Sequence, residues 1–236
     1  RELLASEAAR AEPRYTTLYQ RLGFVENPEP ETRAMAVQVY QDAKQSGDAN
    51  LTTASLYTLG ALAGASQSAG PSATAPLLAL LHDALRTSRT PDTLEQAINA
   101  YANAREPSAP EALARYAKHE APKVRASVAR ALDLHPTKSG ARLLVDLLDD
   151  DHASVQRAAL TSLRAHGLDP EAFDALSRLA RRGELHPSNQ RVVLDLVKHS
   201  SQAHPTLTRD FLVAFTQGGI ADPEVRSAVA NWLTRL

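Results

Sequence analysis

The sequence predicts an all-α fold, a right-handed superhelix of about six helix pairs without a sheet. Apolar residues recur at helical spacing through most of the 236 residues, and Pro, Gly and capping residues separate the apolar stretches. No stretch alternates apolar and polar residues for long enough to indicate a strand. Recurrence of one amphipathic unit is typical of proteins built from stacked helix pairs.

Composition excludes several classes of protein. The net charge is −1 and the pI is about 6.8, which argues against a dedicated nucleic-acid-binding or anionic-membrane protein. The chain has no Cys, so it has no disulfide, thiolate metal ligand or Cys nucleophile. It contains no apolar run of about 18 residues that would predict a membrane span.

The first 30 residues are expected to form an N-terminal helix and a linker. The helix covers residues 1–22 with an interruption at Pro13, and the linker is Asn27-Pro28-Glu29-Pro30. The chain begins with Arg and ends inside a helical pattern, so we expect a fragment of a longer protein. A signal peptide removed from such a protein would fit, and the compartment is left open between cytoplasmic and extracytoplasmic.

Residues 31–236 are expected to form the repeat array. Asp169-Pro170-Glu171 and Asp222-Pro223-Glu224 each predict a helix start, with an Asp cap, a Pro at the first helical position and an acid in the first turn. Residues 64–72 (GASQSAGPS) are the best candidate for a loose loop. The predicted helix pairs lie at about 31–66, 73–104, 110–134, 138–165, 170–200 and 205–235.

The second helices of successive pairs share one apolar stripe. They align on a position that we call the anchor, and the anchors are 31, 31, 34 and 36 residues apart. Apolar or small residues recur four, seven and eight residues after each anchor, and these offsets fall on one face of an α-helix. Asn189 is the polar exception in the second half of the array. The anchors are Thr93, Val124, Val155, Asn189 and Val225.

The segment Pro122–Leu132, read PKVRASVARAL, resembles the second-helix signature of HEAT repeats. Residues 222–229 match it again and residues 153–163 match it more loosely, with Gln156 where Arg is usual. The resemblance implies a solenoid whose second helices line the concave surface. It also implies that Arg125 and Arg226 bond acids such as Asp150 or Asp151 in the turns between neighbouring repeats.

A second, fainter likeness concerns the order of segments. Residues 56–62 (LYTLGAL), a loose loop, a long helix pair and the helix at Pro122 together resemble the helical domain of vitellogenin-like lipid-transfer proteins. That likeness implies lipid as a ligand. The lipid-holding sheets of those proteins are absent here, so lipid carriage does not follow from it alone.

No catalytic, cofactor-binding or metal-ligating residue is predicted. HEAT-type hydroxylases bind two irons through several His-Glu pairs, whereas His119-Glu120 is a single pair. The run Asp149-Asp150-Asp151 lacks the Gly and the distal Glu of a calcium loop, so we expect it to end one helix and cap the next. The sequence has no Gly-x-Ser-x-Gly motif and no Gly-rich phosphate loop after a strand.

Residues opposite the apolar stripe should form the floor of the concave face. Several are basic, so one hypothesis is a docking patch for an acidic segment, because Arg pairs bidentately with carboxylates. The alternative is an ordinary solvated helix face, interrupted by Asp133 and Asp195. The candidate partner-binding residues are Asn99, Arg130, Arg157, Thr161, Arg164, Arg191, Asp195 and Lys198.

These patterns predict a non-enzymatic scaffold that binds a protein partner through its concave face. The first alternative is the helical part of a lipid-transfer or lipoprotein-like protein, the only case in which lipid would be a ligand. The second is a HEAT-type nucleic-acid-processing enzyme, which the neutral pI and the single Trp make less favoured. No nucleic acid is expected as a partner, and the oligomeric state is left open.

Overall fold

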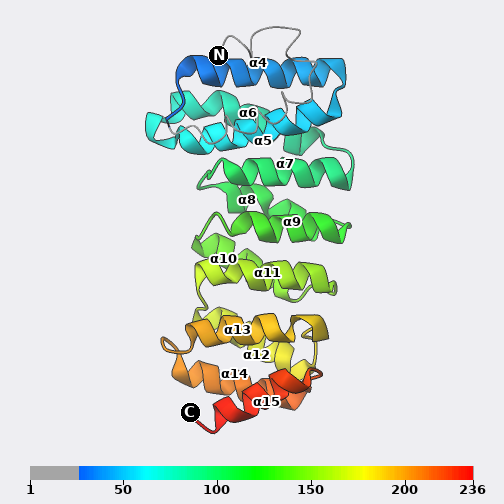
Figure 1. The fold of residues 1–236 in the computed structure, drawn as a ribbon, viewed down its shortest axis with the longest axis vertical. Coiled ribbons are helices and arrows are strands. Elements are labelled where there is room, and N and C mark those ends of the chain that lie inside the picture. Colours follow the sequence, from blue (N-terminus) through cyan, green and yellow to red (C-terminus); the bar gives the residue numbers. More distant parts are fainter. Residues whose placement is uncertain (1–26, 236) are drawn as a thin grey trace. The chain divides into compact units, whose positions relative to one another are not determined.

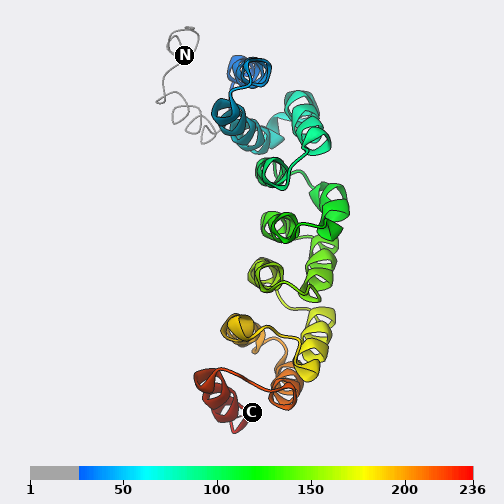
Figure 2. The same cartoon turned by 90° about the vertical axis from the view of Figure 1, so that its right-hand side faces the viewer.

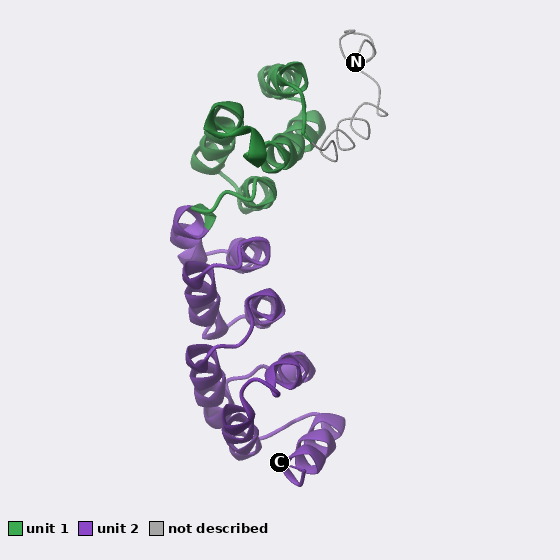
Figure 3. Ribbon diagram, turned by 90° about the vertical axis from the view of Figure 1, so that its left-hand side faces the viewer, with its two compact units in different colours: residues 1–109 green, residues 110–236 purple. Residues whose placement is uncertain are grey.

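The structure, a computed structural model, describes residues 27–235, and these are helical with short connections and no strand. The chain divides into two compact units, residues 1–109 and residues 110–236 (Figure 3). The predicted helix at 1–22 lies outside the described residues, and the predicted division at residue 30 stays a prediction. Within the described range, no helix is both long and apolar enough to cross a membrane.

Unit 1 is organised around its second helix. Helix α5 (Ala49–Ala65) packs against α4 (Pro30–Ser46), α6 (Pro71–Thr87) and α7 (Pro91–Asn103), all labelled in Figure 1. Because α5 meets three neighbours, it is buried on most of its surface rather than along one stripe. Leu59 and Leu62 on α5 are fully buried.

Two glycines allow α5 and α7 to approach closely. A Cβ on Gly60 would overlap the carbonyl oxygen of Ala100, and one on Gly64 would overlap that of Asn103. The expectation of a loose loop at residues 64–72 was therefore wrong. Instead, α5 continues to Ala65, a 3₁₀ turn η1 covers Gln67–Ala69, and α6 begins at Pro71.

Unit 2 contains four helix pairs in two layers, which Figure 2 shows end-on. The first helix of its first pair is short and tightens into a 3₁₀ helix, which closes with a bond from the His119 N–H to the Tyr116 carbonyl. The layer of first helices comprises α8 (Ala109–Leu113) with η2 (Ala114–Lys118), α10 (Lys138–Leu148), α12 (Pro170–Arg182) and α14 (Pro205–Gly218). The layer of second helices comprises α9 (Pro122–Leu132), α11 (Ala153–His166), α13 (Gln190–Ser200), preceded by η3 (Pro187–Asn189), and α15 (Pro223–Leu233).

The predicted apolar stripe forms the core of unit 2. The anchors Val124, Val155 and Asn189 are fully inaccessible to solvent. In α7 the buried face begins at Leu94, one residue after the predicted anchor. Thr93 is exposed there, because it forms a reciprocal capping box with Thr90 at the start of the helix.

The predicted helix caps are confirmed. The side chain of Asp169 accepts a hydrogen bond from the Ala172 N–H at the start of α12. Asp222 accepts from the N–H groups of Glu224 and Val225 at the start of α15. Each carboxylate satisfies backbone donors that have no partner within the helix.

The close approach of α5 to α7 predicts that Gly60→Ala destabilises unit 1. The added Cβ would displace the backbone of α7, and overpacking of this kind costs about 1–3 kcal/mol. Urea unfolding followed by circular dichroism measures the loss. The control is Gly47→Ala, where the Cβ meets no atom and only the positive φ costs free energy, about 1 kcal/mol. An equal loss for both variants would contradict the close-packing explanation.

Candidate functional site

The residue directly after each anchor in unit 2 makes polar contacts beyond its own helix. Arg125 on α9 donates from Nε and Nη2 to the two carboxylate oxygens of Asp150, at 2.6 and 2.8 Å. Its Nη1 donates to the carbonyls of His119 and Glu120. The expected bond to a turn acid of the next repeat is therefore confirmed for Arg125. The hydrogen bond with Asp150 also raises the pKa of the Arg125 guanidinium.

Glutamine performs the equivalent task in the next two repeats. The Gln156 amide donates to the carbonyls of Leu148 and Glu184 and accepts from the His186 N–H. The Gln190 amide similarly accepts from the N–H groups of the turn before α15. Gln therefore bonds the backbone of the neighbouring turn where Arg125 bonds an acid.

The corresponding expectation for Arg226 was wrong. Its guanidinium donates to the carbonyl of Ile220, which lies in the turn before its own helix. The turn before α15 does hold an acid, Asp222, but the side chain of Arg191 on α13 bonds it instead.

Asn189, the polar anchor, completes the contact between α11 and α13. Its side chain is buried and donates to the carbonyl of Ala153 and to Oε1 of Gln156, at 2.9 and 3.1 Å. With an apolar anchor, Oε1 of the buried Gln156 side chain would lose the hydrogen bond that Asn189 donates to it. This explains why the stripe has a polar residue at this position.

Asp150, Asp151 and His152 form the group of possible metal ligands in the described range, with ligand atoms within 4.8 Å of one another. Both carboxylate oxygens of Asp150 already accept hydrogen bonds from Arg125, so a cation there would have to displace the guanidinium. The expectation that this acidic run caps the next helix holds only in part. Asp150 accepts from the His152 N–H, and His152, the N-cap residue of α11, makes no side-chain cap.

The structure distributes the eight candidate partner-binding residues over both units. Asn99 is half-buried on α7 in unit 1, whereas the other seven are exposed on second helices of unit 2. Arg130 bonds the Ser127 hydroxyl within its own helix. Arg191 forms ion pairs with Asp222 and Glu224 and is therefore engaged by the chain itself.

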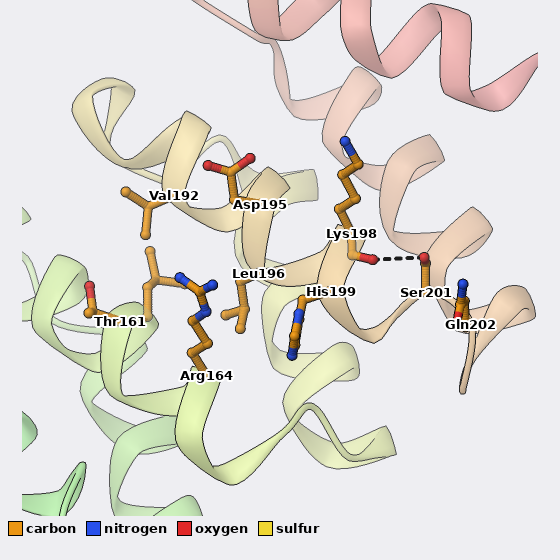
Figure 4. Close-up of a pocket in the computed structure, with 10 residues that line it drawn as sticks. Thr161, Arg164, Val192, Asp195, Leu196, Lys198, His199, Ser201 and Gln202 are labelled. Carbon is orange, nitrogen blue, oxygen red and sulfur yellow. Dashed lines mark hydrogen bonds between the residues drawn. The ribbon is translucent and has the colours of Figure 1, made fainter.

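Four of the eight residues line one groove between α11 and α13, with a volume of about 860 Å³. Thr161 and Arg164 come from α11, and Asp195 and Lys198 come from α13 (Figure 4). The remaining lining residues are Leu160, Val192, Leu196, His199, Ser201 and Gln202.

The groove has an apolar floor and charged walls. Leu160 and Leu196 are buried beneath it. In Figure 4 the Arg164 guanidinium lies between Thr161 and Leu196, whereas the Lys198 ammonium points away from them. The Lys198 carbonyl accepts a hydrogen bond from the Ser201 hydroxyl, which fixes the end of α13 at one side of the groove. Within residues 27–235, neither Arg164 nor Asp195 has a charged partner.

Sequence reasoning missed Val192 and His199, which line the groove in one row with Leu196. These residues are spaced four and three apart, so they share a face of α13 beside the charged face. They lie on α13 beside the residues predicted to form the floor of the concave face, so a search of the neighbouring helix positions would have found them. Leu196 was assigned to the core stripe, and it serves both the core and the groove.

A model of the family described as HEAT repeats matches residues 78–164 and 110–187. Residues 78–187 are HEAT repeats. The matched residues include α9 and α11, and with them Arg125 and Gln156. The groove between α11 and α13 lies where the matched HEAT segment passes into the last helix pairs of unit 2.

Several solved structures resemble the chain at low identity. Two are described as crystal structures of engineered proteins. One has 17% identity and a TM-score of 0.43, covering 93% of this chain and 96% of that one. The other has 16% identity and a TM-score of 0.44, covering 98% and 70%. Human deoxyhypusine hydroxylase in complex with glycerol has 18% identity and a TM-score of 0.39, covering 90% and 81%. The comparison with curated proteins gave no match.

Arg125 holds the Asp150 carboxylate with a fork of two nitrogens, Nε and Nη2. Loss of this fork should destabilise the HEAT array. Arg125→Ala leaves the largely buried carboxylate of Asp150 without its cation, and breaking such a pair costs about 3 kcal/mol. Urea unfolding measures the loss. Arg226→Ala removes a similar side chain that bonds one carbonyl only, so we expect a loss of about 1 kcal/mol. Equal losses would mean that the fork to Asp150 adds nothing.

The contact between α13 and α15 should depend on pH. The hydrogen bond from Arg191 lowers the pKa of the Asp222 carboxyl below its usual range. A lowered pKa in the folded state stabilises the fold above the unfolded-state pKa, and this stabilisation is lost as the pH falls through the folded-state value. In Arg191→Gln, the pKa of Asp222 measured by carboxyl NMR titration should rise toward about 3.9. An unchanged titration would show that Arg191 does not bond Asp222 in solution.

Proposed function

We propose that this chain is a non-enzymatic protein-binding module whose partner docks on the second-helix layer of unit 2, at the α11–α13 groove. The observation that carries the proposal is the groove itself. It joins an apolar floor to an arginine that has no charged partner in the described part of the chain. Apolar contact area with a few oriented polar groups is what a specific docking site needs.

The side chains around the groove suit binding better than catalysis. His199 and Asp195 are both exposed and are not hydrogen bonded to each other. A catalytic base is normally oriented by a hydrogen-bonded third group. The open, charged walls also favour a polypeptide over a lipid chain, which would need an enclosed apolar site.

Photo-crosslinking tests where the partner docks. A photoreactive residue replaces Thr161 in one protein and Arg181 in the other. Thr161 lies at the groove, whereas Arg181 is exposed on α12 in the layer of first helices. We expect a discrete protein adduct from position 161 in a lysate of the source cells and none from position 181.

Adducts of equal yield from both positions would contradict docking at the second-helix layer. Repetition with excess unlabelled chain distinguishes a saturable adduct from collisional labelling, because only a saturable adduct is competed away. An adduct at position 161 that excess chain does not reduce would also count against the proposal.

A further inference from the structure

We infer that the groove's occupant is an acidic protein segment with two carboxylates about 10 Å apart and an apolar side chain on the floor. Arg164, which lines the groove, binds one carboxylate, and Arg157, which lies outside the lining and one helical turn before Thr161, binds the other. This inference rests on the proposed function and specifies the chemistry of the partner. It follows from comparing equivalent positions in successive repeats.

Arg157 and Arg191 hold the same position, two residues after the anchors of α11 and α13. Arg191 is neutralised by the turn before the following second helix, through ion pairs with Asp222 and Glu224. The turn before α13 carries His186 and Ser188 at the places of those two acids.

Arg157 therefore lacks the acids that its counterpart has. In the described residues its guanidinium has no hydrogen-bonding or charged partner, and it lies exposed one helical turn from Thr161. His186 and Ser188 bond each other instead, between Nδ1 and the hydroxyl at 2.9 Å. A carboxylate from another molecule would supply what Asp222 supplies to Arg191.

Arg164 provides the second cation on the same face of α11. It is seven residues from Arg157, two helical turns and about 10 Å along the helix. The Thr161 side chain lies between the two, bonded to the Arg157 carbonyl at 2.8 Å. An extended segment in polyproline II conformation places side chains three residues apart on one side, about 9 Å from each other, so two acids at that spacing match the two arginines.

The opposite wall limits the charge of the occupant. Asp195 faces the groove from α13 without a charged partner in the described range. It repels a continuous polyanion more strongly than a segment with two separated acids, because fewer negative charges then lie near it. The groove is lined by no Phe, Tyr or Trp, and His199 is its only aromatic ring on which a nucleic-acid base could stack. Protein is therefore favoured over nucleic acid.

The test uses a fluorescein-labelled peptide of about a dozen residues, with two Glu three residues apart, one Leu between them, and Ser and Ala elsewhere. Fluorescence anisotropy at low salt measures its binding to the full chain. An exposed ion pair contributes up to about fivefold in affinity, and Glu in place of Arg replaces that attraction with a like-charge repulsion of similar size. We therefore expect Arg157→Glu and Arg164→Glu to weaken binding about tenfold each.

A second variant retains both arginines. His186→Asp with Ser188→Glu places acids where Arg191 has them, so Arg157 should pair internally and the peptide should bind about tenfold more weakly. The control matched for charge is Arg181→Glu, which replaces one cation by one anion, as Arg157→Glu and Arg164→Glu do. Arg181 is exposed on α12 and has no ion pair in the described chain. This control should bind the peptide as the parent chain does.

Three results would overturn the inference: no binding by the parent chain, an equal loss of binding in the control, or equal binding of a second peptide in which Gln replaces both Glu. Tighter binding of a thymidine oligonucleotide, lost in Arg157→Glu, would overturn it in favour of a phosphodiester ligand. If the crosslink from position 161 persists while the peptide fails, the chemistry assigned here is wrong and the docking site stands. If the crosslink fails as well, the proposed function falls with it.

Discussion

The hydrogen bonds that Arg125, Gln156 and Gln190 make to neighbouring turns are the constraint on which unit 2 depends. Stacked helix pairs bury apolar faces against one another, but apolar contact alone does not fix how far one pair slides or rotates on the next. Arg125, Gln156 and Gln190 each bind a neighbouring turn, and their donors and acceptors accept only a narrow range of positions. These bonds align the second helices, and their alignment determines the groove between α11 and α13.

The use of Gln in two of the three positions has a physical reason. The turns before α13 and α15 present backbone N–H and C=O groups to this position, and a neutral amide can serve both kinds of group at once. Arg125 faces a carboxylate and two carbonyls, all of them acceptors, for which a guanidinium with donors only is the better match.

Much of the fold could be predicted from the sequence because apolar periodicity and capping residues are local signals. The helices and the caps at Asp169 and Asp222 follow from them. The close packing of Gly60 and Gly64 against α7 could not be read in this way. A Gly-rich segment indicates a loop unless the facing backbone is known. For the same reason Arg191 and Arg157 looked alike in the sequence, and only the opposing turns separate them.

Some contacts between successive second helices of unit 2 are charged and others are neutral. These contacts should therefore respond differently to salt and to pH. Salt and acid weaken the exposed ion pairs of Arg191, whereas they leave the buried amide contacts of Gln156 and Asn189 nearly unchanged. Helix α15 is the helix that those ion pairs hold, and only Val225 and Val229 are buried along it. It should therefore be the first helix of unit 2 to fray, while the pairing of α11 with α13 persists and keeps the groove intact.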